Sequence, residues 1–221
     1  MNYRMIFIAG IFCVLISCNS SDKSDTKADT GRTEIGTAKP ADSGQALQPA
    51  AQLIAAWQGM NRQLEAMTFS GNVDRDFAML MKQHHMAAIN LSRVEVSVGN
   101  NREMKEMADK IVSVQQGEVG EFDQILMKLP ASGNSKFGKQ ALAVIRRTDQ
   151  LKIDSSSVDI TYSNLMTAHH TDAIRIARDY LQQGKHAGLK EIAARMIKEQ
   201  QKDINAMKEW QMAISKQNSM K

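Results

Sequence analysis

The sequence predicts an all-α protein in which two similar helical hairpins pack as a four-helix bundle. Three observations support this fold class. Apolar residues recur every three or four positions from about residue 47 onward, which indicates amphipathic helices. No stretch shows the alternation of apolar and polar residues that is typical of a strand. The third observation is an internal duplication, so that an element predicted in one copy is expected in the other.

The duplication relates residues 74–122 to residues 159–207 without a gap, at an offset of 85 positions, with 14 identities among 49 aligned pairs. The residues of the first copy that are identical in the second are Asp74, Leu80, Met81, His84, His85, Ala88, Ile89, Arg93, Gly99, Lys105, Glu106, Ala108, Gln115 and Gln116. We therefore predict a duplicated helical domain over residues 47–217, with repeat 1 at about 72–128 and repeat 2 at about 157–213.

The N-terminus has the pattern of a secretory signal. A short basic start is followed by twelve apolar residues, 5–16, which are too few for a membrane-spanning helix of roughly 20 residues. The run ends in Leu-Ile-Ser-Cys at 15–18, which resembles a bacterial lipobox. Residues 1–17 are then a lipoprotein signal peptide, and Cys18 becomes the lipidated first residue. An ordinary signal peptide that contains a cysteine is the alternative.

Residues 18–46 are almost entirely polar or small, so we expect a disordered tether after the lipidated cysteine. The protein would be an exported lipoprotein of the outer membrane, on its periplasmic or its surface face. Cys13 and Cys18 are the two cysteines, which leaves no thiol for a disulfide in the domain. The net charge of +4 is spread over interleaved acidic and basic residues with few aromatics, which argues against a nucleic-acid partner.

The helices are expected in the following order. Ser70-Gly71-Asn72, Gly99-Asn100 and Gly184 mark helix ends, and Asn72 or Asp74 can cap the helix that follows. Pro130 lies in a loop over 128–136 between the two repeats. The predicted helices span about 50–68, 74–98, 102–127, 137–151, 159–183 and 187–216, with those at 50–68 and 137–151 as shorter accessory helices. On the helix at 102–127, one face carries Met104, Met107, Ala108, Ile111, Val114, Val119 and Phe122.

Four of the five histidines stand in two pairs, one in each repeat. Neighbouring helix residues diverge by about 100°, so the two rings of a pair cannot point the same way. His84 and His169 share the register of the apolar stripe and are expected to face the core, while His85 and His170 lie at its edge. We also expect His84 and His169 to approach each other if the repeats are related by a pseudo-two-fold axis.

The second helix of each hairpin places polar residues on its apolar face: Gln115 and Glu118 in repeat 1, and Gln200 and Asp203 in repeat 2. Because a buried polar group needs a partner, the simplest expectation is that His84 meets Gln115 or Glu118 and that His169 meets Gln200 or Asp203.

These residues suggest a metal site. Met81 and Met166 precede their histidine pairs by one helical turn, and thioether and imidazole are ligands for copper, above all Cu(I). Glu118 and Asp203, with Gln115 and Gln200, would then orient the imidazoles from behind. The alternative is that each methionine is core packing and each histidine makes a structural hydrogen bond.

A larger set of residues resembles a known family. The set is Gly71, Asn72, Val73, Asp74, Phe77, Met81, His84, His85 and Ala88, followed by Ala108, Ile111, Gln115 and Glu118. It resembles domain-of-unknown-function family three hundred and five, strongly over 74–128 and more loosely over 159–211. The resemblance implies a ferritin-like fold and export, and some members of that family are described as copper-binding, with roles in periplasmic copper handling. The metal ligands that it implies here are Met81, His84, His85, Met166, His169 and His170.

The sequence does not predict an enzyme. Di-iron carboxylate bundles use a Glu three residues before a His, and no histidine here has one. No Gly-x-Ser-x-Gly, phosphate loop or His-Glu-x-x-His is found either. Two function hypotheses remain. The first is a lipid-anchored, copper-binding envelope protein that sequesters the ion or transfers it to a partner protein. The second is a non-catalytic envelope interaction or scaffold bundle.

Overall fold

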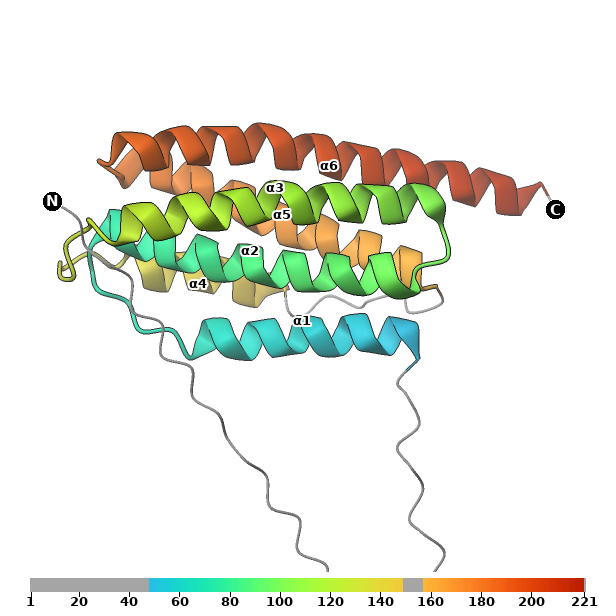
Figure 1. Ribbon diagram of the computed structural model, residues 1–221, viewed down its shortest axis with the longest axis horizontal. Coiled ribbons are helices and arrows are strands. Elements are labelled where there is room, and N and C mark those ends of the chain that lie inside the picture. The colour runs from blue at the N-terminus through green and yellow to red at the C-terminus, as the bar shows by residue number, and fades with distance from the viewer. Residues whose placement is uncertain (1–47, 149–156, 221) are drawn as a thin grey trace, which may run out of the picture. The chain divides into compact units, whose positions relative to one another are not determined.

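The computed structural model describes residues 48–148 and 157–220, and within these ranges the fold is all-α, as predicted (Figure 1). The helices are α1 (Pro49–Glu65), α2 (Val73–Val98), α3 (Arg102–Leu126), α4 (Phe137–Thr148), α5 (Val158–Gln183) and α6 (Ala187–Ser219). The predicted signal peptide, Cys18 and the tether lie outside the described residues, as does the end of the predicted helix at 137–151. Among the described helices, none combines the length and the apolar character needed to cross a membrane.

The two hairpins pack as the predicted four-helix bundle. Helices α2 and α3 form the first hairpin and α5 and α6 the second, and the hairpins meet through α2 against α5 and α3 against α6. The accessory helices α1 and α4 both pack against α2 and α5 (Figure 1). As a result α2 and α5 have neighbours on several sides, which places the histidine-bearing helices at the centre of the bundle.

The turn within each hairpin is hydrogen-bonded to an aspartate of the other hairpin. Asp74, at the start of α2, accepts hydrogen bonds at Oδ1 from the Tyr180 hydroxyl at 2.6 Å and from the backbone N–H of Lys185 and His186 at 2.8 and 3.1 Å. Asp159, at the start of α5, accepts from the N–H of Asn100 and Asn101 at 2.9 and 2.8 Å. Each hairpin therefore caps the turn of the other, and this explains why the aspartate is identical in both repeats.

Each turn has a glycine at the equivalent position because a side chain of the preceding helix lies directly against its Cα atom. A Cβ atom at Gly184 would lie 2.3 Å from the Tyr180 ring, and one at Gly99 would lie 2.3 Å from the Glu95 carboxyl group. Tyr180 and Glu95 occupy the same repeat position, and both face the aspartate supplied by the other hairpin. Only a residue without a side chain leaves room for this pairing.

Two expectations about the elements were wrong in detail. Val114, predicted on the apolar face of α3, is 41% exposed, because the buried line of this helix passes through the polar Gln115 and Glu118 instead. The first helix ends at Glu65 rather than at residue 68, since the chain turns through Ser70, whose N–H and hydroxyl both donate to Asp76 Oδ1 at 2.7 Å. Asn72 is the N-cap of α2, and its side chain accepts from the Arg75 N–H at 3.0 Å.

Candidate metal-binding site

The paired histidines lie side by side at the centre of the bundle. His84 and His85 come from α2, His169 and His170 come from α5, and none of the four is more than 1% exposed. Both rings of each pair are buried because α2 and α5 are covered on more than one face. The edge positions of the predicted stripe are therefore also interior positions.

The inner pair meets across the interface between the repeats, as expected. The rings of His84 and His169 lie with their centroids 3.5 Å apart and their planes at 30°. The Nε2–H of His169 donates to the backbone carbonyl oxygen of His84 at 2.9 Å. Trp57 of α1 meets the His169 ring edge-on at 6.2 Å, so that α1 covers this side of the pair.

The outer pair, and not the inner pair, meets the carboxylates. His85 Nε2 lies 2.8 Å from Glu118 Oε2, and His170 Nε2 lies 3.6 Å from Asp203 Oδ2, which is too long for a hydrogen bond. The prediction that His84 and His169 would make these contacts was therefore wrong. One residue along a helix turns a side chain by about 100°, and this rotation points the second histidine toward the partner helix of its own hairpin while the first points at the other hairpin.

The glutamines beside the carboxylates are not the partners of the histidines. The Oε1 atom of Gln115 and both polar side-chain atoms of Gln200 are buried without a hydrogen-bond partner among the described residues. Their identity in both repeats is thus not explained by a bond to an imidazole.

Burial keeps the inner imidazoles uncharged. It lowers the pKa of His84 and of His169 well below the usual value, and each is lowered further by neighbouring histidines of the cluster. Burial also lowers the pKa of His170, although Asp203 opposes this shift. A neutral His169 whose Nε2 carries the donated proton presents a lone pair at Nδ1. The Nδ1 atoms of all four histidines are buried without a hydrogen-bond partner among the described residues.

The other predicted ligands are buried in the same helices. Met81 and Met166 are each 0% exposed and belong to the apolar core. In residues 48–148 and 157–220, no group of three or more His, Cys, Asp or Glu side chains is arranged to hold a metal ion. Imidazole nitrogens and thioether sulfurs are donor types that suit a soft ion.

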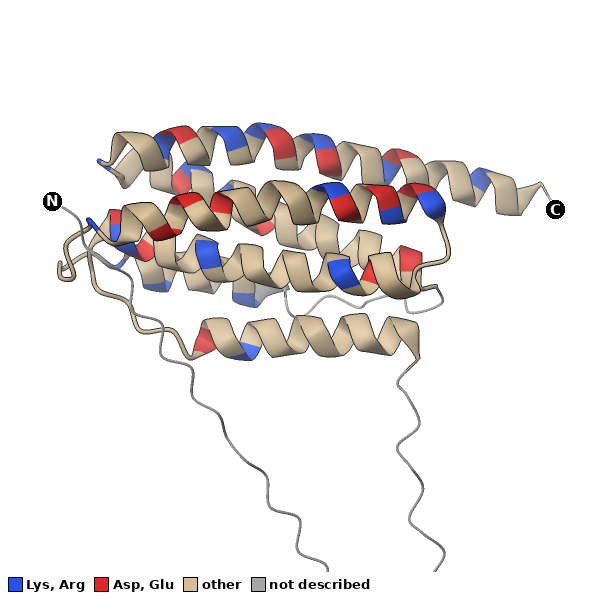
Figure 2. Cartoon of the chain, in the orientation of Figure 1, with Lys and Arg blue, Asp and Glu red and all other residues tan. Residues whose placement is uncertain are grey.

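Two basic residues that the sequence analysis missed complete the carboxylate contacts. Arg195 of α6 lies 3.4 Å from Glu118 Oε1, and Lys110 of α3 lies 3.2 Å from Asp203 Oδ1. Basic and acidic residues are interleaved along α6 and along the first half of α3, so nothing marks these two among their neighbours by charge (Figure 2). The signal that could have identified them is the duplication, because positions 110 and 195 are equivalent and both are basic.

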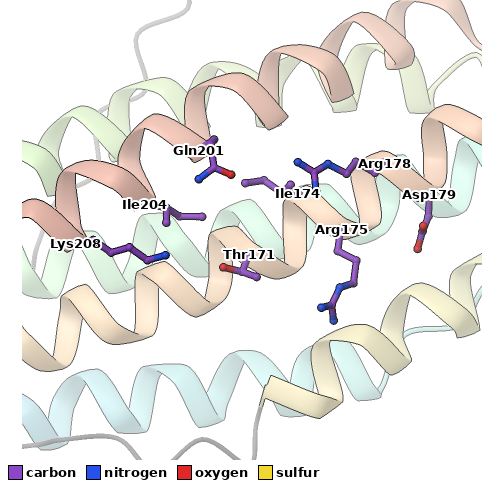
Figure 3. A pocket seen from close by; sticks show the side chains of 8 residues that line it. All are labelled: Thr171, Ile174, Arg175, Arg178, Asp179, Gln201, Ile204 and Lys208. Carbon is purple, nitrogen blue, oxygen red and sulfur yellow. The ribbon is translucent and has the colours of Figure 1, made fainter.

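A surface groove between α5 and α6 does not reach the imidazoles. It has a volume of about 360 Å³, and a similar groove occurs between α2 and α3. The lining residues of the first groove, shown in Figure 3, are Thr171, Ile174, Arg175, Arg178, Asp179, Gln201, Ile204 and Lys208. The four histidines line neither groove.

The chain was also compared with known protein families. The chain matches the family "Domain of unknown function (DUF305)" over residues 20–126 and 132–211, and it belongs to that family. The two matched segments correspond to the two repeats. No curated protein and no solved structure was found to match the chain.

Proposed function

We propose that this protein is a lipid-anchored envelope protein that binds copper through the methionine and histidine side chains of its core, and that sequesters the ion or transfers it to a partner protein. The observation that carries the proposal is the set of four buried Nδ1 atoms without a hydrogen-bond partner among the described residues. A buried polar atom left unpaired costs on the order of 1–3 kcal/mol, and four such atoms on two helices in contact need an explanation. A bound ion would supply one.

The chemistry of these donors fits Cu(I). Metal binding requires deprotonated ligands, and the lowered pKa values of His84 and His169 leave their imidazoles neutral under physiological conditions. Met81 and Met166 stand one turn before the pairs and would add thioether ligands. His85 and His170 would complete the set, with Glu118 and Asp203 orienting them from behind. The ion would be bound as cargo through soft donors, and it would not take part in a chemical reaction.

The test is a titration of the purified protein with Cu(I) under anaerobic conditions, in competition with a chromogenic Cu(I) chelator. We expect binding in the wild type and its loss when His84, His85, His169 and His170 are all replaced by Ala. The double variant Met81→Leu/Met166→Leu nearly conserves side-chain volume and should fold, yet it should bind Cu(I) roughly tenfold more weakly or worse, the factor that 1.4 kcal/mol of lost ligand affinity produces. Unchanged stoichiometry in the quadruple variant would refute the proposal.

A matched control is available in the fifth histidine. His186 lies outside the cluster and accepts the Leu189 N–H at Nδ1 as the N-cap of α6. His186→Asn retains a capping side chain and removes an imidazole, so it should leave Cu(I) binding unchanged.

The second candidate is a non-catalytic envelope scaffold in which the histidines are structural. The bonds from His85 to Glu118 and from His169 to the His84 carbonyl favour it, since both are ordinary buried hydrogen bonds. It predicts no specific metal uptake and a large drop in melting temperature after His84→Ala or His169→Ala. Metal titration followed by thermal melting of the same samples separates the two functions.

A further inference from the structure

The buried Glu118 and the partly buried Asp203 each lie between an interior imidazole and an exposed cation. Glu118 is in contact with His85 on its inner side and with Arg195 on its outer side. Asp203 lies between His170, at the longer distance of 3.6 Å, and Lys110, at 3.2 Å. The side chains of Arg195 and Lys110 are 43% and 57% exposed, whereas both histidines are fully buried. A row of cation, carboxylate and imidazole therefore runs from the surface into the core in each repeat.

The two rows are related by the duplication, position for position. His85 corresponds to His170, Glu118 to Asp203 and Lys110 to Arg195. The residue type differs at two of the three positions, but the charge is the same at all of them. Retention of charge without retention of side-chain shape indicates that the charge itself matters.

The cation of each row comes from the other hairpin. Lys110 of the first hairpin meets Asp203 of the second, and Arg195 of the second meets Glu118 of the first. Arg195 also bonds Glu121 of α3 at 2.6 Å. Both rows therefore form only when α3 and α6 are docked against each other.

The cation and the carboxylate of each row carry opposite charges. Imidazole and carboxylate are both ligands for a divalent ion such as Zn²⁺. A nearby positive charge opposes a divalent ion twice as strongly as a monovalent one, because the Coulomb energy scales with the ion's charge. Lys110 and Arg195 also pair with carboxylate oxygens that could otherwise act as metal ligands.

We propose that Lys110 and Arg195 are specificity-determining residues, which neutralise Asp203 and Glu118 and so keep divalent ions from competing for the buried histidines. This inference rests on the proposed copper function for its biological meaning. It makes its own prediction, however: removal of the two cations creates affinity for a divalent ion.

The experiment compares Co²⁺ binding, followed by visible absorption, in the wild type and in the Lys110→Gln/Arg195→Gln variant. Co²⁺ accepts imidazole and carboxylate ligands as Zn²⁺ does and has an absorption spectrum that reports them. We expect the double variant to bind Co²⁺ at least tenfold more tightly than the wild type, because loss of one charge near a divalent ion changes its affinity by roughly tenfold even in a water-like dielectric. Both substituted residues are well exposed, so the variant should fold, which its circular dichroism verifies.

Two controls separate local charge from other effects. Lys110→Arg/Arg195→Lys keeps the charges and should behave as the wild type does. Lys202→Gln removes an exposed cation that pairs with Glu199 instead of Glu118 or Asp203, and it should not raise Co²⁺ affinity. Equal Co²⁺ affinity in the wild type and the double variant would overturn the inference, as would an equal gain in Lys202→Gln.

The Cu(I) titration of the wild type keeps this inference distinct from the proposed function. If the wild type binds Cu(I) and the double variant gains no Co²⁺ affinity, the specificity inference alone fails. If the double variant gains Co²⁺ affinity and the wild type does not bind Cu(I), the copper function fails while the role of the two cations as a barrier to divalent ions stands.

Discussion

Replacement of Glu95 by Gln should change how the stability of the protein depends on pH. Glu95 is completely buried, and as a carboxylate it would have no hydrogen-bond donor among the described residues. Burial, and then the neighbouring Asp159 carboxylate, raise the pKa of Glu95 to about 8 from a usual value of 4.5. At neutral pH the side chain is therefore a carboxylic acid that can donate its proton to Asp159.

The size of the effect follows from this pKa. Between pH 4.5 and about 8 the folded protein holds a proton at Glu95 that the unfolded chain has lost. The free energy of unfolding then falls as the pH rises through this range, by about 1.4 kcal/mol for each pH unit. The total loss is on the order of 5 kcal/mol, it is complete above about pH 8, and none of it applies below about pH 4.5.

The assay is chemical denaturation followed by circular dichroism at several values between about pH 5 and about pH 9, which cover the range over which Glu95 is linked to folding. The amide introduced by Glu95→Gln can donate to Asp159 at every pH, so the variant should lose this contribution to the pH dependence and be the more stable protein above about pH 8. Glu106→Gln, which removes an exposed carboxylate, should follow the wild type. Parallel curves for the wild type and Glu95→Gln would show that Glu95 is ionised in the folded state and that the reasoning is wrong.

Four further changes test the fold by chemical denaturation. Asp74→Ala removes the acceptor of three hydrogen bonds and should lower the free energy of unfolding by about 2–4 kcal/mol; a loss below about 1 kcal/mol would mean that the exchanged caps contribute little. Tyr162→Phe removes the 2.7 Å bond to the Ser92 hydroxyl and should cost about 1 kcal/mol, with no change as evidence against that bond. Gly71 has φ +80° and its added Cβ would lie 2.5 Å from the Gly133 carbonyl oxygen, so Gly71→Ala should cost at least about 1–2 kcal/mol. By contrast Gly117→Ala, where a Cβ meets nothing, should stabilise α3 by about 0.5–1 kcal/mol; equal effects at the two glycines would contradict this interpretation.

The helices and their pairing could be predicted from the sequence because the same signals occur at equivalent positions of both repeats. A helix end at Gly99 alone is a weak signal, but the same glycine at 184 in an ungapped repeat makes the hairpin turn hard to miss. The approach of His84 to His169 was predictable on the same grounds, since equivalent residues near a pseudo-two-fold axis meet each other. In this protein the duplication is the strongest structural signal.

The partners of the imidazoles could not be predicted, because the sequence does not say how deeply α2 is buried. A helix with one buried face would expose His85 and leave His84 as the natural partner of Glu118. Here α1, α3, α4 and α5 all pack against α2, so that residues about 100° apart are both interior. The cations were missed for a related reason: Lys110 and Arg195 act across the contact between the hairpins, and helical periodicity describes a single helix.

The position shared by Glu95 and Tyr180 shows what the duplicated unit had to keep. The aspartate that each faces is identical in both repeats, while the residue that faces it is a carboxylic acid in one and a phenol in the other. These side chains differ in size and ordinary acidity, but each can offer an O–H group to a buried carboxylate. If the position facing the aspartate needed only to be filled by an apolar side chain, no O–H group would be required there. The pH dependence predicted for Glu95 would then be absent. A fall in the free energy of unfolding as the pH rises to about 8 would show that Glu95, like Tyr180, offers a proton to the aspartate of the other repeat. The absence of that fall would show that the two repeats do not share this interaction.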